Sequence, residues 1–84
     1  MCGESMMTLI HSVLREKGMS MDSINHFLRL ELFNTTLEDR MALRQFSEEG
    51  VHEEEAAQKL MSRKMHRLYA QLMSGRYDRR FRFY

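Results

Sequence analysis

Very little in this chain can interrupt a helix, because its 84 residues include no proline and only four glycines. Gly18, Gly50 and Gly75 each follow a stretch with helical periodicity, where a glycine can adopt the left-handed conformation that ends a helix. We therefore predict an all-α fold, a small bundle or orthogonal array of about four helices. A chain of this length makes one domain, which we assign to residues 1–75, and residues 76–84 form a basic, aromatic C-terminal tail.

The first two predicted helices carry apolar residues at helical spacing behind polar caps. Ser5 is a suitable N-cap for the first helix, and Ser20 or Asp22 for the second. The inward residues of the first helix are Met6, Leu9, Ile10, Val13 and Leu14. The apolar residues of the second cover more than one stripe, which predicts burial on two sides: Met21, Ile24, Phe27, Leu28, Leu30, Leu32 and Phe33. Residues 28–32 also alternate with period two, which leaves open a short strand that pairs with residues 81–83.

The third predicted helix begins at a capping box and ends near Gly50. The box is formed either by Thr35 with Glu38 or by Thr36 with Asp39, since both pairs have the required spacing. The residues predicted to face inward are Leu37, Met41, Leu43 and Phe46.

One segment resembles a known family. Residues 43–51, followed by 54–60 and 62–68, are similar to the helix-turn-helix of response-regulator and sigma-type DNA-binding domains. The resemblance covers under a third of the chain. It implies that Ala57 allows the recognition helix to approach closely and that residues 62–67 face the major groove.

The same region also fits a single long helix. Residues 60–62 lack the glycine-bearing turn of the family, and nothing from Glu53 to Ser74 breaks helical periodicity. This helix would have an apolar seam with spacings of four, four, three and four: Ala57, Met61, Met65, Leu68 and Leu72. The seam is self-complementary, so we predict a homodimer through it.

Charge is divided along the chain. From Met1 to Glu55 there are 11 acids and 5 bases, whereas from Ala56 to Tyr84 one acid accompanies eight bases, so the formal charge of +1 is −6 plus +7. The basic part also holds five of the eight aromatic residues. Arginine can bind phosphate through two hydrogen bonds, and aromatic rings can stack on bases. We therefore predict a small regulatory protein that binds nucleic acid through its last helix and tail.

The predicted contact residues are Arg63, Lys64, Arg67, Arg76, Tyr77, Arg79, Arg80, Phe81, Arg82 and Tyr84. The same residues would also suit an acidic protein surface. A further alternative is that Phe81 and Phe83 fold back onto the core while the arginines stay in water. The tail could also pair with the acidic front of a neighbouring copy.

The high methionine content, nine of the 84 residues, indicates a second possible function. Methionine side chains are flexible, and surfaces rich in them can receive the amphipathic helix of a partner. The alternative function is therefore a protein adaptor, inhibitor or small chaperone that binds an acidic or amphipathic-helix partner. Filling of the core is the competing explanation for the methionines.

No pattern in the sequence indicates a reaction. The histidines form no His-x-x-x-His pair, and Cys2 is the only cysteine, so we expect no enzyme activity, metal or cofactor. A lone cysteine indicates a reducing, intracellular setting such as the cytoplasm. The longest uncharged stretch, residues 5–14, is too short and polar to cross a bilayer, so we expect no membrane partner.

Overall fold

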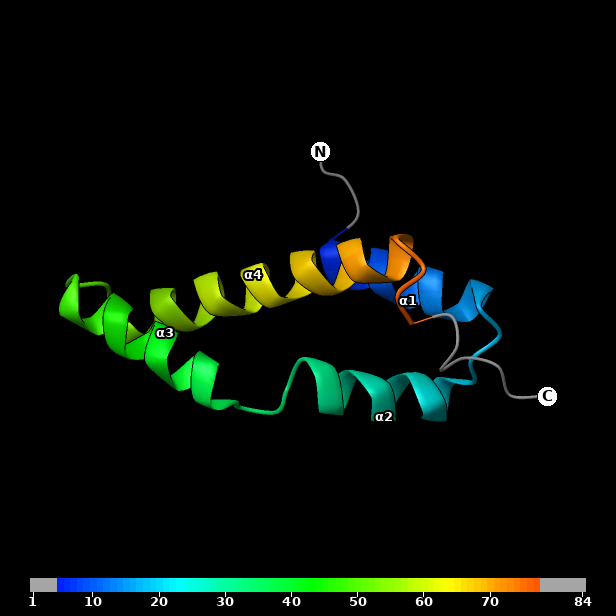
Figure 1. The fold of residues 1–84 in the computed structure, drawn as a ribbon, viewed down its shortest axis with the longest axis horizontal. Helices are drawn as coiled ribbons and strands as arrows, with labels where there is room; N and C mark the ends of the chain where they lie inside the picture. The colour runs from blue at the N-terminus through cyan, green and yellow to red at the C-terminus, as the bar shows by residue number, and fades with distance from the viewer. Residues whose placement is uncertain (1–4, 78–84) are drawn as a thin grey trace.

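The computed structural model describes residues 5–77, and within that range the chain forms four α-helices and no strand (Figure 1). They are α1 (Met6–Glu16), α2 (Met21–Glu31), α3 (Leu37–Glu48) and α4 (Glu53–Met73). The predicted all-α class and the number of helices are therefore confirmed. The alternative of a strand at residues 28–32 is wrong, because this segment completes α2 and its C-cap. Its proposed partner, residues 81–83, lies outside the described residues.

Local sequence signals set the bounds of α1 and α2. The hydroxyls of Ser5 and Ser20 accept hydrogen bonds from the backbone N–H groups of Thr8 and Ser23, each at 3.2 Å. Gly18 then takes the left-handed conformation, with φ of 91°, between the two helices. The predicted cap of α1 is thus confirmed, and of the two candidates for α2 the structure uses Ser20.

A reciprocal capping box starts α3. The Thr36 hydroxyl accepts from the N–H of Asp39 and the Asp39 carboxylate accepts from the N–H of Thr36, both at 3.1 Å. The helix ends before Gly50, whose φ is 83°. At the start of α4 the Nδ1 atom of His52 accepts from the N–H of Glu54 at 3.3 Å. These polar side chains satisfy backbone donors that have no partner within the helix.

The long helix α4 packs against both α3 and α1 (Figure 1). Its N-terminal half packs against α3, its C-terminal half packs against α1, and α2 packs against α1. The molecule is consequently elongated, with extents of 48 × 34 × 23 Å. We refer to α3 with the N-terminal half of α4 as the α3–α4 arm.

The main core lies between α1, α2 and the C-terminal half of α4. Its buried residues are Ile10, Leu14, Met19, Ile24, Phe27, Leu28, Leu32, Leu68 and Leu72. Several half-buried side chains pack against it, among them Met6, Met7, Met61 and Met65, so these methionines serve to fill the core. The α3–α4 arm lies beyond this cluster and buries Phe46 and Ala56.

The prediction that α2 is buried on two sides is wrong. Met21, Leu30 and Phe33 are 47%, 49% and 57% exposed, whereas Ile24, Phe27 and Leu28 are buried. Only the face of α2 that points to the main core is covered, because no other helix of residues 5–77 packs on its opposite side (Figure 1).

The prediction that Leu37 and Met41 face inward is also wrong. They are 73% and 64% exposed, whereas Phe46 is buried and Leu43 is half-buried. Helical residues two positions apart differ by ~200° in direction. Met41 and Leu43 therefore cannot both face α4.

The long-helix interpretation is confirmed, since α4 continues without a break from Glu53 to Met73. Residues 60–62 are helical where a helix-turn-helix would turn, so the helix-turn-helix hypothesis is wrong. No helix within residues 5–77 is long and apolar enough to cross a membrane.

The predicted dimer seam is largely used inside one chain. Leu68 and Leu72 are buried in the main core, so a second copy cannot reach them while this fold is kept. At the start of the seam Ala57 is exposed and Ala56 is buried instead. The register shifts because the first half of α4 faces α3 and the second half faces α1. The homodimer itself stays a prediction.

Candidate interaction surface

A group of exposed apolar side chains surrounds the connection between α2 and α3. The large apolar residues exposed within 5–77 are Met21, Leu30, Phe33, Leu37, Met41 and Met73. Four of these six lie within the twelve residues 30–41. Apolar residues gathered on a surface mark interaction sites more often than isolated ones do. We call Leu30, Phe33, Leu37 and Met41 the α2–α3 apolar surface.

The central part of this surface is the face of α3 that points away from α4. Leu37 and Met41 are one turn apart and differ by only about 40° in direction. Asp39 and Phe46, which are 7% and 8% exposed, lie on the opposite side of the helix against α4. The capping box fixes where α3 begins, and burial of Phe46 fixes its rotation, so Leu37 and Met41 are held outward.

Two arginines follow one edge of this outward face. Arg40 and Arg44 are exposed, and with Leu37 and Met41 they have the i, i+3, i+4, i+7 spacing of a single helix face. Considering residues 5–77, neither guanidinium group makes a hydrogen bond or an ion pair. Glu38 lies on the opposite edge of the face, where it lines a different pocket.

A shallow open groove of about 450 Å³ runs along the arginine edge, between α3 and the start of α4. Leu43, Val51 and Ala56 supply its apolar lining, and Arg40 and Arg44 form its border with the outward face. Glu53 lines its opposite side, at the start of α4. The edge therefore combines apolar area with positive charge that has no partner in the described part of the chain.

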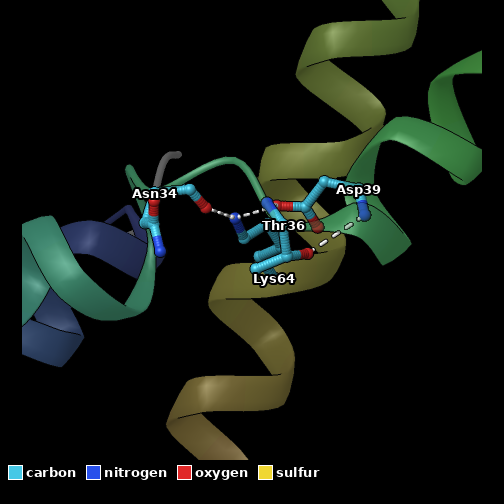
Figure 2. A network of polar contacts seen from close by, with 4 residues as sticks. All are labelled: Asn34, Thr36, Asp39 and Lys64. Carbon is cyan, nitrogen blue, oxygen red and sulfur yellow. Dashed lines mark hydrogen bonds and ion pairs between the residues drawn. The ribbon is translucent and has the colours of Figure 1, made fainter.

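Lys64 of α4 contacts both α3 and the connection between α2 and α3 (Figure 2). Its Nζ atom donates to Oδ2 of Asp39 at 2.6 Å and to the carbonyl oxygen of Asn34 at 3.2 Å. The side chains of Lys64 and Asp39 are only 13% and 10% exposed. The ion pair joins the middle of α4 to the first turn of α3 and to the α2–α3 connection, so it positions the apolar surface.

Asp39 is ionised in this network. Burial raises the pKa of its carboxyl group, but the hydrogen bond from Lys64, the bonds from Thr36 and the charge of Lys64 together lower the pKa by more. The net result is a pKa below the ordinary value for aspartate, so the ion pair persists throughout the neutral range.

The basic residues predicted to bind nucleic acid have different environments in α4. Arg63 and Arg67 are exposed, whereas the ammonium group of Lys64 is engaged by Asp39 and Asn34. The guanidinium carbon of Arg63 lies 5.3 Å from the centre of the Phe46 ring, a cation–π contact that leaves its N–H groups available.

The beginning of the predicted tail packs against the main core. The Tyr77 hydroxyl hydrogen-bonds with Oε1 of Glu31 at 2.7 Å and Oε1 of Gln71 at 2.9 Å, and its ring meets that of Phe27 edge-on at 5.5 Å. Tyr77 is therefore not available for base stacking in this structure, whereas Arg76 is exposed. The remaining predicted contacts lie outside the described residues: Arg79, Arg80, Phe81, Arg82 and Tyr84.

Sequence reasoning missed the apolar surface, although a signal for it was present. In residues 37–48 the pair Leu37 and Met41 points to one side of a helix, and the pair Leu43 and Phe46 points to the other. A helix with two opposed apolar sides has either two neighbours or one exposed side. The covered side could not be chosen without knowing that, within residues 5–77, α3 packs mainly on α4.

Comparison with known proteins adds no functional assignment. The chain matches no protein-family model, and no curated protein or solved structure is significantly similar to it. Within residues 5–77, no group of three or more His, Cys, Asp or Glu side chains is arranged to hold a metal ion.

Proposed function

We propose that this chain is a non-catalytic protein-interaction module, and that it binds an amphipathic helix of a partner through the α2–α3 apolar surface. The observation that carries the proposal is the exposure of Leu37 and Met41 on the side of α3 opposite to α4. A partner helix that packs on such a surface uses apolar anchors at i, i+3, i+4 and i+7. The other side of α3 is anchored by Phe46 and the Asp39–Lys64 pair, so the surface is ready without rearrangement.

The size of the surface favours a reversible complex. Full burial of a leucine, methionine or phenylalanine side chain contributes about 1.5–3 kcal/mol. Association costs at least about 4 kcal/mol in lost translational and rotational freedom. Four partly exposed anchors therefore support a regulated, transient contact rather than an obligate one.

Methionine methyl NMR tests this proposal directly. The protein with ¹³C-methyl methionine is titrated with a synthetic helical peptide that has leucines at i, i+3, i+4 and i+7. The Met41 methyl signal should shift, whereas that of Met19, which is 8% exposed in the main core, should not. If only the methyl signal of the exposed Met73 shifts, the peptide binds elsewhere and the proposal is wrong.

A matched pair of variants completes this test. Leu37→Ser with Met41→Ser should weaken peptide binding by at least about tenfold, because two apolar anchors are lost. Met73→Ser removes an equally exposed methionine from another part of the molecule and should leave the affinity unchanged. If the two variants bind the peptide with equal affinity, the peptide does not bind at the α2–α3 apolar surface.

A second candidate function is nucleic-acid binding, and it is favoured by a row of exposed cations on α4. Lys59, Arg63 and Arg67 follow one another at four-residue spacing along one side of the helix. Anisotropy of labelled duplex and single-stranded oligonucleotides at low and near-physiological salt tests this function. Binding that persists near physiological salt and falls in the Arg63→Gln, Arg67→Gln variant supports it, and no binding at low salt overturns it.

A further inference from the structure

We infer that the helix received by α3 is acidic, with carboxylates that pair with Arg40 and Arg44. This inference rests on the proposed function and adds the charge of the partner and the edge on which that charge lies. It starts from two exposed guanidinium groups that have no hydrogen-bonding or ionic partner in residues 5–77.

The spacing of the two arginines matches the spacing of carboxylates on a helix. Arg40 and Arg44 are four residues apart, which corresponds to ~6 Å along the axis of α3. Acidic residues at i and i+4 of a partner helix have the same separation. Each guanidinium group can bind a carboxylate through two parallel hydrogen bonds, so two such pairs would fix the partner along α3.

The charge differs between the two edges of the outward face. Arg40 and Arg44 border a groove whose other charged residue is Glu53, so two bases face one acid there. Glu38 lies on the other edge, beside a pocket whose charged residues are three acids and two bases: Glu31, Glu38, Asp39, Lys64 and Arg67. The arginine edge is therefore net positive and the Glu38 edge net negative. A matching helix therefore has its acidic pair on one side of its leucines and no acidic residue on the other side. The asymmetry selects one orientation of the partner about its own axis.

A second copy of this chain is a poorer occupant. A two-fold symmetric contact places the same patch of both copies in one interface. It would bring together Arg40 and Arg44 from each copy, four arginines in all, around the apolar centre. An acidic partner neutralises these charges, whereas a second copy concentrates them.

The test uses two synthetic helical peptides that share one leucine face. One carries glutamates at i and i+4 beside the leucines, and the other carries lysines there. Dissociation constants for the full-length protein are measured by anisotropy at 50 mM and 150 mM salt. The glutamate peptide should bind about tenfold more tightly than the lysine peptide, and this preference should be greater at the lower salt concentration.

Charge reversal on the protein provides the matched control. Arg40→Glu with Arg44→Glu should lower the affinity for the glutamate peptide and raise the affinity for the lysine peptide, each by about tenfold. Arg15→Glu with Arg76→Glu makes the same change in net charge at exposed positions that line neither the groove nor the pocket beside Glu38. This control should change both affinities much less than tenfold. Circular dichroism verifies the fold, and Arg40→Gln with Arg44→Gln replaces the reversal if that variant loses helix.

If both peptides bind equally and charge reversal changes neither, the acidic partner is wrong and the proposed function stands. If neither peptide binds, the proposed function fails together with this inference. If sedimentation shows a dimer that the Leu37→Ser, Met41→Ser variant dissociates, the surface belongs to a second copy. If binding of the glutamate peptide is lost only in the Arg15→Glu, Arg76→Glu variant, the peptide binds elsewhere.

Discussion

The ammonium group of Lys64 lies 2.6 Å from Oδ2 of Asp39, and this ion pair joins α4 to the first turn of α3. Asp39 also caps α3 through Thr36, so one carboxylate starts the helix and attaches it to α4. Because α3 lies outside the main core, this pair and Phe46 determine how α3 presents its outward face.

Replacement of Lys64 by methionine should destabilise the protein by about 3 kcal/mol, because it leaves the carboxylate of Asp39 buried without its counter-charge. In the Asp39→Asn background the same replacement should cost much less, since no charge is stranded. Urea unfolding of the four proteins in this cycle measures the coupling. Equal costs in both backgrounds would mean that Lys64 and Asp39 are not energetically coupled.

Acidic pH should lower the free energy of unfolding, partly because Asp39 becomes protonated. Its pKa in the folded state lies below the unfolded value of about 3.9, so its stabilisation is fully present above that pH. The stabilisation is lost as pH falls through the lower folded-state pKa. The difference in unfolding free energy between the wild type and Asp39→Asn should therefore shrink from pH 5 to pH 2. A constant difference over this range would contradict the lowered pKa.

Tyr77→Phe should lower stability by about 1 kcal/mol, because it removes hydrogen bonds to Glu31 and Gln71 while keeping the ring on Phe27. Tyr77→Ala should cost more, since the edge-on ring contact and the buried area are lost as well. Thermal unfolding of both variants checks this order. Equal costs for the two would show that the ring contributes nothing beyond the hydroxyl.

Gly50→Ala should destabilise the turn between α3 and α4 by about 1 kcal/mol. The cause is conformational, because φ is 83° and a Cβ atom at this position would meet no other atom within 4 Å. Gly50→Asn is the matched control and should cost less, since asparagine tolerates this region better than alanine does. If alanine is no worse than asparagine in chemical denaturation, the strain argument is wrong.

The two faces of α3 should respond differently to substitution. Leu37→Ser and Met41→Ser are expected to change the unfolding free energy by no more than about 0.5 kcal/mol, because both side chains are largely exposed. Phe46→Ala should cost about 3 kcal/mol, since it empties the packed face of the same helix. Denaturant midpoints of the three variants provide the comparison. A large loss on the outward face would show that Leu37 or Met41 is structural.

Much of the fold could be predicted because its signals are local. Ser5 and Thr36 hydrogen-bond within three residues of their own positions, and Gly18 and Gly50 need only their own backbone conformation to end a segment. The unbroken α4 follows from the absence of any helix-breaking residue. Such signals depend on nearby residues in the chain and need no knowledge of the tertiary structure.

The candidate surface could not be predicted in the same way. Leu37 and Phe46 are both apolar residues of one helix, and their chemistry does not indicate which of them faces α4. The same holds for the bases of α4, where Lys64 is nearly buried and Arg63 and Arg67 are exposed. The environment of each side chain depends on which elements pack beside it.

The sequence by itself determined where the helices begin and end, since caps, helix propensity and glycine stops act over a few residues. Only the tertiary structure decided which helix faces are covered, that Lys64 meets an aspartate 25 positions away, and that Tyr77 bonds to Glu31 across 46 positions. The physical reason is that burial and ion pairing depend on packing between distant segments. That packing placed Leu37 and Met41 at the surface.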